Sequence, residues 1–159
     1  MVSIKWCWKQ SKGLSLIEPN MNIAESYSKL AEASIGTMNR EKDKNLVFSI
    51  SAGYYSIYYS LYSILMALGI KCEIHQCTIK FCEIFLKEFF TKSDFKIIND
   101  SFKLRNIAQY YVDKIIDNNE INQLIKNAPS LVAKSKEVLI GLNENNVEKI
   151  RTNFENTFC

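Results

Sequence analysis

The chain has 159 residues, of which 47% are apolar and 23% are charged. This length supports one domain with a sizeable core and requires no second domain. The net charge of +3 is only mildly basic, so it permits a nucleic-acid partner without arguing for one. Five glycines and two prolines leave few breaks for strands and turns. This composition predicts an all-α fold, an up-and-down bundle of four to six helices.

Residues 1–19 are expected to form an irregular, partly docked arm that precedes a helical bundle over 20–159. The start of the chain, MVSIKWCWKQSKG, lacks the continuous apolar run of a secretory signal, and the number of cysteines, five, is odd. Both features predict a reduced chain in the cytoplasm.

A first helix is predicted from a cap at Asn20 or Asn22 to about Arg40. Apolar or small side chains recur along it at three- and four-residue spacing, at positions 23, 27, 30, 31, 34, 35 and 38. This spacing puts them on one face, which is expected to point to the core.

The segment 46–70 carries no charged residue and is long enough to span a bilayer as a helix. It also holds five tyrosines and five serines, whose hydroxyls would be costly in hydrocarbon unless partnered. A helix that is apolar all round is also what the centre of a bundle requires. A central helix ending at Gly69 is therefore predicted, with no membrane contact.

Two stripes run along this second helix. Small residues form the first, at Ala52, Ser56, Ser60 and Ser63. Phenols form the second, at Tyr55, Tyr59 and Tyr62. One interpretation is core packing with locally satisfied hydroxyls. The other is a self-complementary homodimer interface, in which these tyrosines meet the polar face of the fourth helix across a two-fold axis.

The remaining helices are predicted from periodicity and breakers. The third runs from about 73 or 75 to 90, and the fourth from about 94 to 117 with a possible interruption near 99–101. The fifth covers 120–142 with a kink or break at Pro129. A last short helix covers 146–158.

The fourth predicted helix has two contrasting faces. The core face is expected to hold Leu104, Ile107, Ala108, Tyr111 and Ile115. The opposite face is expected to hold Arg105, Asn106, Gln109, Tyr110 and Asp113. A cation, two amides, a phenol and a carboxylate thus gather on one arc, which is either a ligand-binding site or a solvated face held by side-chain pairs.

No metal or cofactor is expected. The run Cys72, His75, Cys77 and Cys82 lacks an established zinc-ligand spacing, and its side chains would diverge on a helix. The glycine-rich loops that cradle phosphates in ATPases and dehydrogenases are absent from the sequence.

The order of these segments resembles the HEPN domain family of prokaryotes. The resemblance rests on SAGYYSIYYSLYSILMALGI in the second helix, the short link to His75, and LRNIAQYYVD in the fourth helix. The leading WCWKQSKGLSLIEPN is also similar to the arm of archaeal members. The resemblance covers nearly the whole chain and rests on the order and spacing of short motifs.

The resemblance implies a dimeric bundle of four or more helices, in a family rich in metal-independent ribonucleases. Many are toxins paired with a nucleotidyltransferase-fold partner. The nucleases carry an arginine followed after four to six residues by a histidine. Arg105 matches the arginine, but tyrosines and a valine occupy the histidine positions. A phenol, with an ordinary pKa of about 10, is a poor base.

Two functions follow as hypotheses. The first is an RNA- or nucleotide-associated module with weak or lost ribonuclease activity, acting at a dimer cleft. Its candidate catalytic residues are Arg105 and Tyr110. Its candidate ligand-binding residues are Arg105, Asn106, Gln109, Tyr110, Asp113, Tyr55 and Tyr59. The second hypothesis is a non-catalytic helical subunit that binds a nucleotidyltransferase-fold protein.

Overall fold

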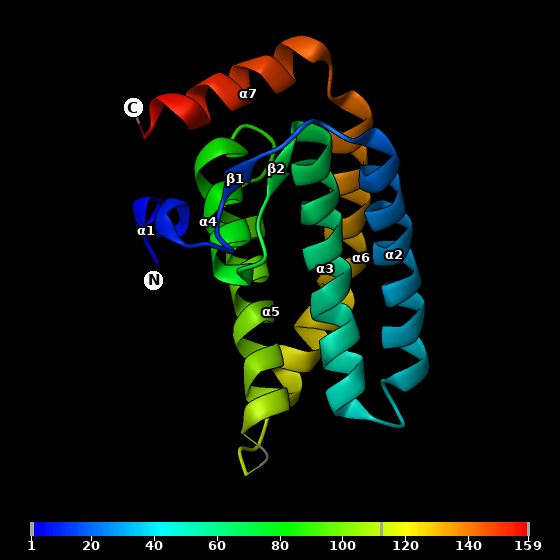
Figure 1. The fold of residues 1–159 in the computed structure, drawn as a ribbon. Coiled ribbons are helices and arrows are strands. Elements are labelled where there is room, and N and C mark those ends of the chain that lie inside the picture. The colour runs from blue at the N-terminus through cyan, green and yellow to red at the C-terminus, as the bar shows by residue number, and fades with distance from the viewer. Residues whose placement is uncertain (1, 112, 159) are drawn as a thin grey trace.

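The computed structural model describes residues 2–111 and 113–158. Over this part of the chain it forms a helical bundle with one two-stranded antiparallel sheet (Figure 1). The helices are α1 (Ile4–Lys9), α2 (Met21–Glu41), α3 (Leu46–Leu68), α4 (His75–Phe85), α5 (Lys92–Tyr110), α6 (Asn118–Gly141) and α7 (Glu144–Asn156). The strands are β1 (Ser15–Leu16) and β2 (Ile70–Lys71). The predicted all-α class is confirmed.

The uncharged segment becomes α3, which lies among α2, α4, α5 and α6. The Asn45 side chain accepts from the Phe48 amide at its start, and Gly69 ends it in the left-handed conformation with φ of 68°. Within residues 2–111 and 113–158, no helix is long and apolar enough to cross a membrane. Most of the apolar side chains of α3 are buried inside the bundle, although Leu46, Val47 and Phe48 in its first turn are exposed.

The small residues of α3 let neighbouring helices approach it closely. The Ser56, Ser60 and Ser63 hydroxyls donate to carbonyls three residues earlier at 2.7–2.8 Å, and the Ser60 and Ser135 hydroxyl oxygens lie 3.1 Å apart between α3 and α6. A Cβ atom at Gly53 would meet Met38 Sδ at 2.8 Å. Core packing with locally satisfied hydroxyls is therefore the correct interpretation of this stripe.

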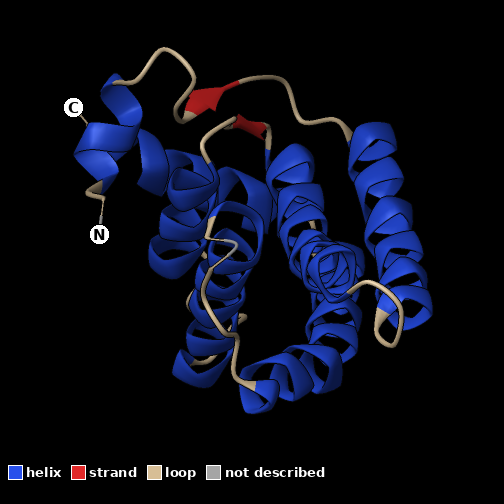
Figure 2. Ribbon diagram, turned by 90° about the horizontal axis from the view of Figure 1, so that it is seen from below, coloured by secondary structure: helices blue, strands red, loops and turns tan. Residues whose placement is uncertain are grey.

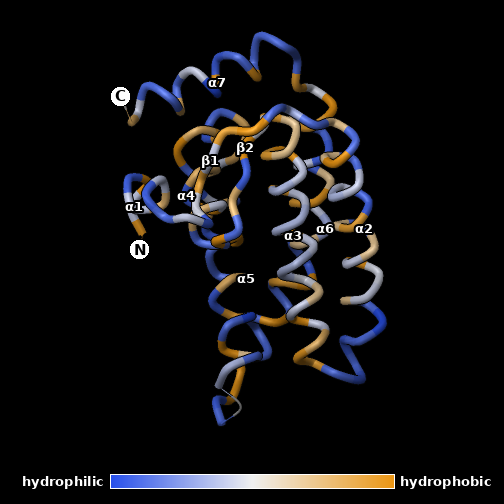
Figure 3. The backbone as a smooth tube through the Cα atoms, viewed as in Figure 1, coloured by the Kyte–Doolittle hydropathy of each residue, from blue (hydrophilic) through white to orange (hydrophobic). Residues whose placement is uncertain are grey.

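The arm is more ordered than the sequence predicted. It contains α1 and β1, and β1 pairs with β2 at the edge of the bundle (Figure 2). A disulfide joins Cys7 of α1 to Cys77 of α4, so the expectation of a fully reduced chain is wrong at these two positions. Hydrophilic residues mark the turn between α2 and α3 and much of α7, which crosses one end of the bundle (Figure 3).

Helix α5 starts at a capping box, in which Thr91 and Asp94 each accept from the other's backbone amide. It continues through 99–101 without the expected interruption and ends at Tyr110, earlier than predicted. Tyr111 is therefore 50% exposed and Ile115 is 99% exposed, so their placement in the core was wrong. Leu104 and Ala108 are buried as expected.

Helix α6 runs from Asn118 to Gly141 with Pro129 inside it, so of the kink or break predicted at this proline, the break does not occur. Proline lacks the amide hydrogen of an ordinary helical residue, and neighbouring turns carry the helix across this position. Ala128 and Leu131 on either side are buried against the rest of the core.

Candidate functional site

Arg105 projects from α5 toward α3 and is surrounded by oxygen atoms and aromatic rings. Its Nη2 donates to the Tyr55 hydroxyl at 2.9 Å. Its Nη1 donates to Asn106 Oδ1 at 3.0 Å, and a longer contact of 3.5 Å reaches the Tyr110 hydroxyl. The guanidinium carbon also lies 5.4–5.8 Å from the ring centroids of Tyr54, Tyr55 and Tyr110. These contacts fix the orientation of the cation.

The partners of Arg105 are neutral groups. Among residues 2–111 and 113–158, no carboxylate forms an ion pair with Arg105. Its buried Nε also finds no acceptor in the described part of the chain. A buried donor left unsatisfied costs about 1–3 kcal/mol, and such groups concentrate where function sets the arrangement. The site therefore holds a positive charge that no carboxylate of the described residues neutralises.

His75 is the site residue that the sequence reasoning missed. It begins α4, and its Nδ1 lies 2.6 Å from the Tyr54 hydroxyl. The imidazole stacks on the Tyr58 ring with centroids 4.0 Å apart. Tyr54 and Tyr58 are one helical turn apart on α3, so their rings lie next to each other. The chain turns back after Gly69, and His75 then packs against both rings. That spacing was a usable signal, but the resemblance implied a catalytic histidine on the fourth helix and assigned no role to His75.

The environment of His75 keeps its imidazole neutral. Burial, followed by the positive charge of Arg105, lowers the pKa of His75 to about 4. The Tyr54 phenol is buried beside it, and burial raises the pKa of Tyr54 well above its usual range. Neither group changes its charge near neutral pH, so this pair is poorly suited to general acid–base catalysis there.

Of the other predicted site residues, Gln109 and Tyr59 pack against side chains of α3, whereas Asp113 lies beyond the end of α5. Gln109 joins α5 to α3, because its Nε2 donates to the Ser51 hydroxyl at 3.0 Å. Tyr59 stacks on Tyr55 with centroids 5.4 Å apart, which extends the aromatic surface away from Arg105. Asp113 lies beyond the end of α5 and is exposed. Its placement on the same helical arc as Arg105 was wrong, because that arc stops at Tyr110.

One interpretation of the sequence placed the helix-two tyrosines against the polar face of the fourth helix of a partner subunit, and in the structure such a contact forms within one chain. Tyr55 of α3 bonds directly to Arg105 of α5, and Tyr27 of α2 packs on Tyr59 and Tyr62. A two-fold axis is not needed to bring these groups together. The cluster is thus complete as an intramolecular arrangement.

The cysteines near His75 do not form a ligand set. Cys77 is bonded to Cys7, while Cys72 and Cys82 are buried thiols. Across the described ranges there is no group of three or more His, Cys, Asp or Glu side chains that could hold a metal ion.

Comparison with protein-family models and with curated proteins found no match for this chain.

Proposed function

We propose that the chain is a HEPN-like module that binds single-stranded RNA or a nucleotide through Arg105, with weak or lost ribonuclease activity. The observation that carries the proposal is the guanidinium itself, which is oriented by Tyr55 and Asn106 and has no carboxylate partner among the described residues. A phosphate would supply the missing negative charge and could accept two parallel hydrogen bonds from the fork.

The tyrosines around Arg105 support RNA in preference to a phosphate-bearing protein. Tyr110 is 67% exposed, and Tyr55 and Tyr59 are partly exposed. Exposed aromatic faces stack on unpaired bases without regard to sequence, each contributing about 1–3 kcal/mol. Arg105 would then hold the backbone while the phenols receive the bases.

Weak or lost cleavage follows from the protonation states at the site. Cleavage without a metal requires one group that removes the 2′ proton and another that protonates the leaving oxygen. His75 has a pKa of about 4, so it is a weak base at neutral pH and supplies no proton there. Tyr110 replaces the family's histidine on α5 and is a phenol.

The test is a binding titration of a short single-stranded RNA at fixed salt, by fluorescence anisotropy. Arg105→Gln should weaken binding about ten- to hundredfold, the value of a charge-assisted contact of about 1.5–3 kcal/mol. Arg40→Gln is the matched control, because Arg40 is exposed on α2 and donates to Thr37 of the same helix. Equal losses in both variants would contradict a phosphate site at Arg105.

A second candidate function is an interaction subunit that forms a homodimer or binds a nucleotidyltransferase-fold protein. An apolar face of α2 favours it, since Ile23 and Leu30 are 42% and 44% exposed and flank the partly exposed Tyr27. Light scattering tests the homodimer: a dimer converted to a monomer by Leu30→Glu would support it, and a monomeric wild type would rule it out. A cytoplasmic location belongs to both proposals.

A further inference from the structure

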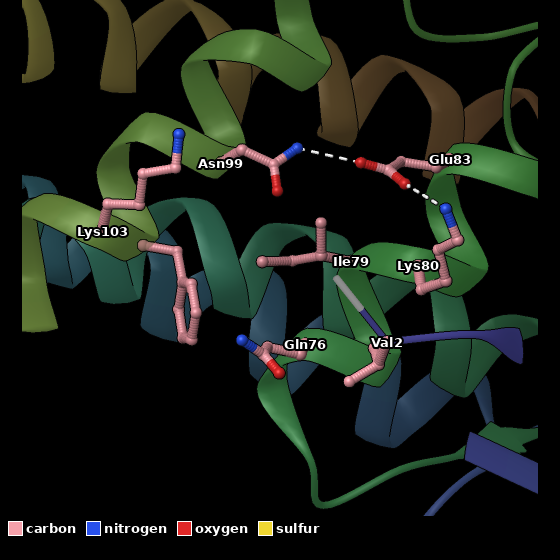
Figure 4. Close-up of a pocket in the computed structure, with 8 residues that line it drawn as sticks. Val2, Gln76, Ile79, Lys80, Glu83, Asn99 and Lys103 are labelled. Carbon is pink, nitrogen blue, oxygen red and sulfur yellow. Dashed lines mark hydrogen bonds and ion pairs between the residues drawn. The ribbon is translucent and has the colours of Figure 1, made fainter. Parts of the chain in front are cut away.

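A small pocket lies between α4 and α5 (Figure 4). It adjoins the Arg105 cluster, formed by Arg105, Tyr54, Tyr55 and His75, because its lining residue Phe102 packs near Tyr54. We propose that it is a nucleobase subsite, which takes a base carrying an exocyclic amino group next to the phosphate at Arg105. This inference rests on the proposed function. The pocket encloses about 230 Å³, less than the roughly 300–1,000 Å³ of sites for drug-sized ligands, so it suits a single ring system and not a whole nucleotide.

The pocket and the Arg105 cluster share a wall. Phe102 lines the pocket, and its ring centroid lies 5.8 Å from that of Tyr54, which also contacts His75 and Arg105. Gln76 lines the pocket from α4, directly after His75. Phe102 precedes Arg105 by three residues, and Asn99 precedes Asn106 by seven. Since one turn of helix rises about 5.4 Å, the two sites are one to two turns apart along α5.

The pocket combines apolar sides with a polar end. Ile79 and the ring of Phe102 form apolar surfaces, on which a base could pack by its faces. At the polar end, Asn99 of α5 meets Glu83 and Lys80 of α4 (Figure 4). This division of apolar faces and a polar edge matches the surface of a nucleobase.

At that end, Asn99 and Glu83 present acceptor atoms, while the Lys80 ammonium donates to Glu83. The Asn99 amide nitrogen donates to Glu83 Oε1 at 2.9 Å and to the Phe95 carbonyl at 2.8 Å, which uses both of its hydrogens. Its oxygen therefore remains as an acceptor, and in Figure 4 it points toward Ile79. Glu83 accepts from Asn99 and, at 3.0 Å, from Lys80, and each carboxylate oxygen keeps a further lone pair.

Two neighbouring acceptors select a base with an N–H₂ group. Adenine, cytosine and guanine each carry one, whereas uracil offers a single ring N–H between two carbonyl oxygens, which would face Glu83 and Asn99 as like dipoles. The pocket should therefore discriminate against uracil. Lys103 at the rim is exposed, and its Nζ lies 3.4 Å from Asp100 Oδ1, so it is available to a neighbouring phosphate.

The experiment measures binding of AMP, CMP, GMP and UMP, and of inorganic phosphate, to the full chain by calorimetry. For the wild type, each amino-bearing nucleotide should bind at least about fivefold more tightly than UMP, the lower range for one good base contact. Glu83→Gln replaces one acceptor oxygen by a donor, so it should bring the four nucleotides to within about twofold of one another. Asn99→Leu, which removes the other acceptor, should have the same effect.

Arg105→Gln separates this inference from the function on which it rests. It should weaken all four nucleotides and inorganic phosphate alike while keeping the preference over UMP. Equal affinities of the wild-type chain for the four nucleotides, with all of them lost in Arg105→Gln, would overturn the base subsite alone. A preference that survives both Glu83→Gln and Asn99→Leu would do the same. Absence of binding by every nucleotide and by phosphate would overturn the phosphate site and the subsite together.

Discussion

The Arg105 guanidinium donates to side-chain oxygens of Tyr55 and Asn106. This distinguishes it from Arg151, another of the chain's three arginines, which donates to backbone carbonyls. Arg151 donates through Nη1 to the carbonyls of Ile17, Leu68 and Gly69, and so ties α7 to the β1–β2 region. That role is structural. Arg105 instead keeps its Nη atoms at a partly exposed surface among phenols. The difference in surroundings, not the residue type, is why Arg105 is the proposed binding residue.

Tyr55→Phe tests the orientation of the guanidinium. The variant keeps the ring but removes the hydroxyl that accepts from Nη2 at 2.9 Å. Affinity for single-stranded RNA should fall several-fold, because one hydrogen bond contributes about 0.5–1.5 kcal/mol, while thermal stability should change little. The measurement is the same anisotropy titration, paired with a thermal melt. Unchanged RNA affinity would mean that Tyr55 does not position Arg105.

The stability of the fold should depend on pH through His75. Its pKa is lowered by burial and by Arg105 to about 4, whereas in the unfolded chain it is about 6.5. Between these values the unfolded chain binds a proton that the folded chain does not, so stability falls as the pH falls from about 6.5 to about 4. Discounted for the part of the ring that solvent reaches, the loss should be about 1–2 kcal/mol.

The check compares urea unfolding of the wild type and of His75→Phe at pH 7 and pH 4.5. His75→Phe keeps a ring against Tyr58 but cannot titrate, so it should lose less stability on acidification than the wild type. Carboxylates contribute equally to both proteins and cancel in the difference. Identical pH dependence would show that His75 is not held neutral by its surroundings.

At the scale of elements, the sequence predicted best those helices whose ends carry a chemical signal. Asn20 caps α2 and Gly69 ends α3, as expected from residue type. Nothing comparable marks the end of α5, because the residues after Tyr110 continue the apolar and polar alternation of a helix. As a result, Arg105, Asn106 and Tyr110 lie together as the helical spacing predicted, whereas Asp113 lies beyond the end of the helix. Helix α1 has six residues, which is too short for a helical pattern to be recognised in the sequence.

The early end of α5 changes the expected effect of Tyr111→Ala. A core tyrosine would have cost roughly 3 kcal/mol or more on truncation, but Tyr111 is half exposed and packs against Lys114, whose Nζ lies 4.5 Å from the ring centroid. The cost should therefore stay below about 1 kcal/mol. Phe154 is fully buried in α7, and Phe154→Ala should cost about 3–5 kcal/mol. Denaturant unfolding of both variants measures the contrast, and equal costs would contradict the position of Tyr111.

At the scale of the whole molecule, contacts between residues that are far apart in the sequence hold the arm to the bundle. Cys7 and Cys77 are 70 residues apart, and Trp8 stacks on Phe158 with centroids 4.6 Å apart. Sequence reasoning could not find the bond, because five cysteines allow many pairings and none is favoured by spacing. The spacing of Tyr54 and Tyr58 indicated that a third group could pack on their rings, but which group does so depends on how the segment between α3 and α4 folds back.

Reduction of the disulfide should destabilise the chain without abolishing the bundle. Closing a loop of this length contributes about 4 kcal/mol in the chain-entropy estimate, and measured values typically lie at about 2–4 kcal/mol. Unfolding of the oxidised protein should therefore require more denaturant than unfolding of Cys7→Ser. A thiol titration under denaturing conditions, without reductant, should count two fewer thiols than after reduction. Equal counts would mean that the bond does not form.

The salt dependence of RNA binding tests the central claim, that Arg105 contacts a phosphate, most directly. Each phosphate contact to a single strand contributes about 0.7 to the slope of log affinity against log salt concentration. Arg105→Gln should reduce the steepness of that slope by about 0.7 relative to the wild type, and Arg40→Gln should leave it unchanged. Parallel lines for the wild type and Arg105→Gln would show that this arginine does not meet the RNA backbone.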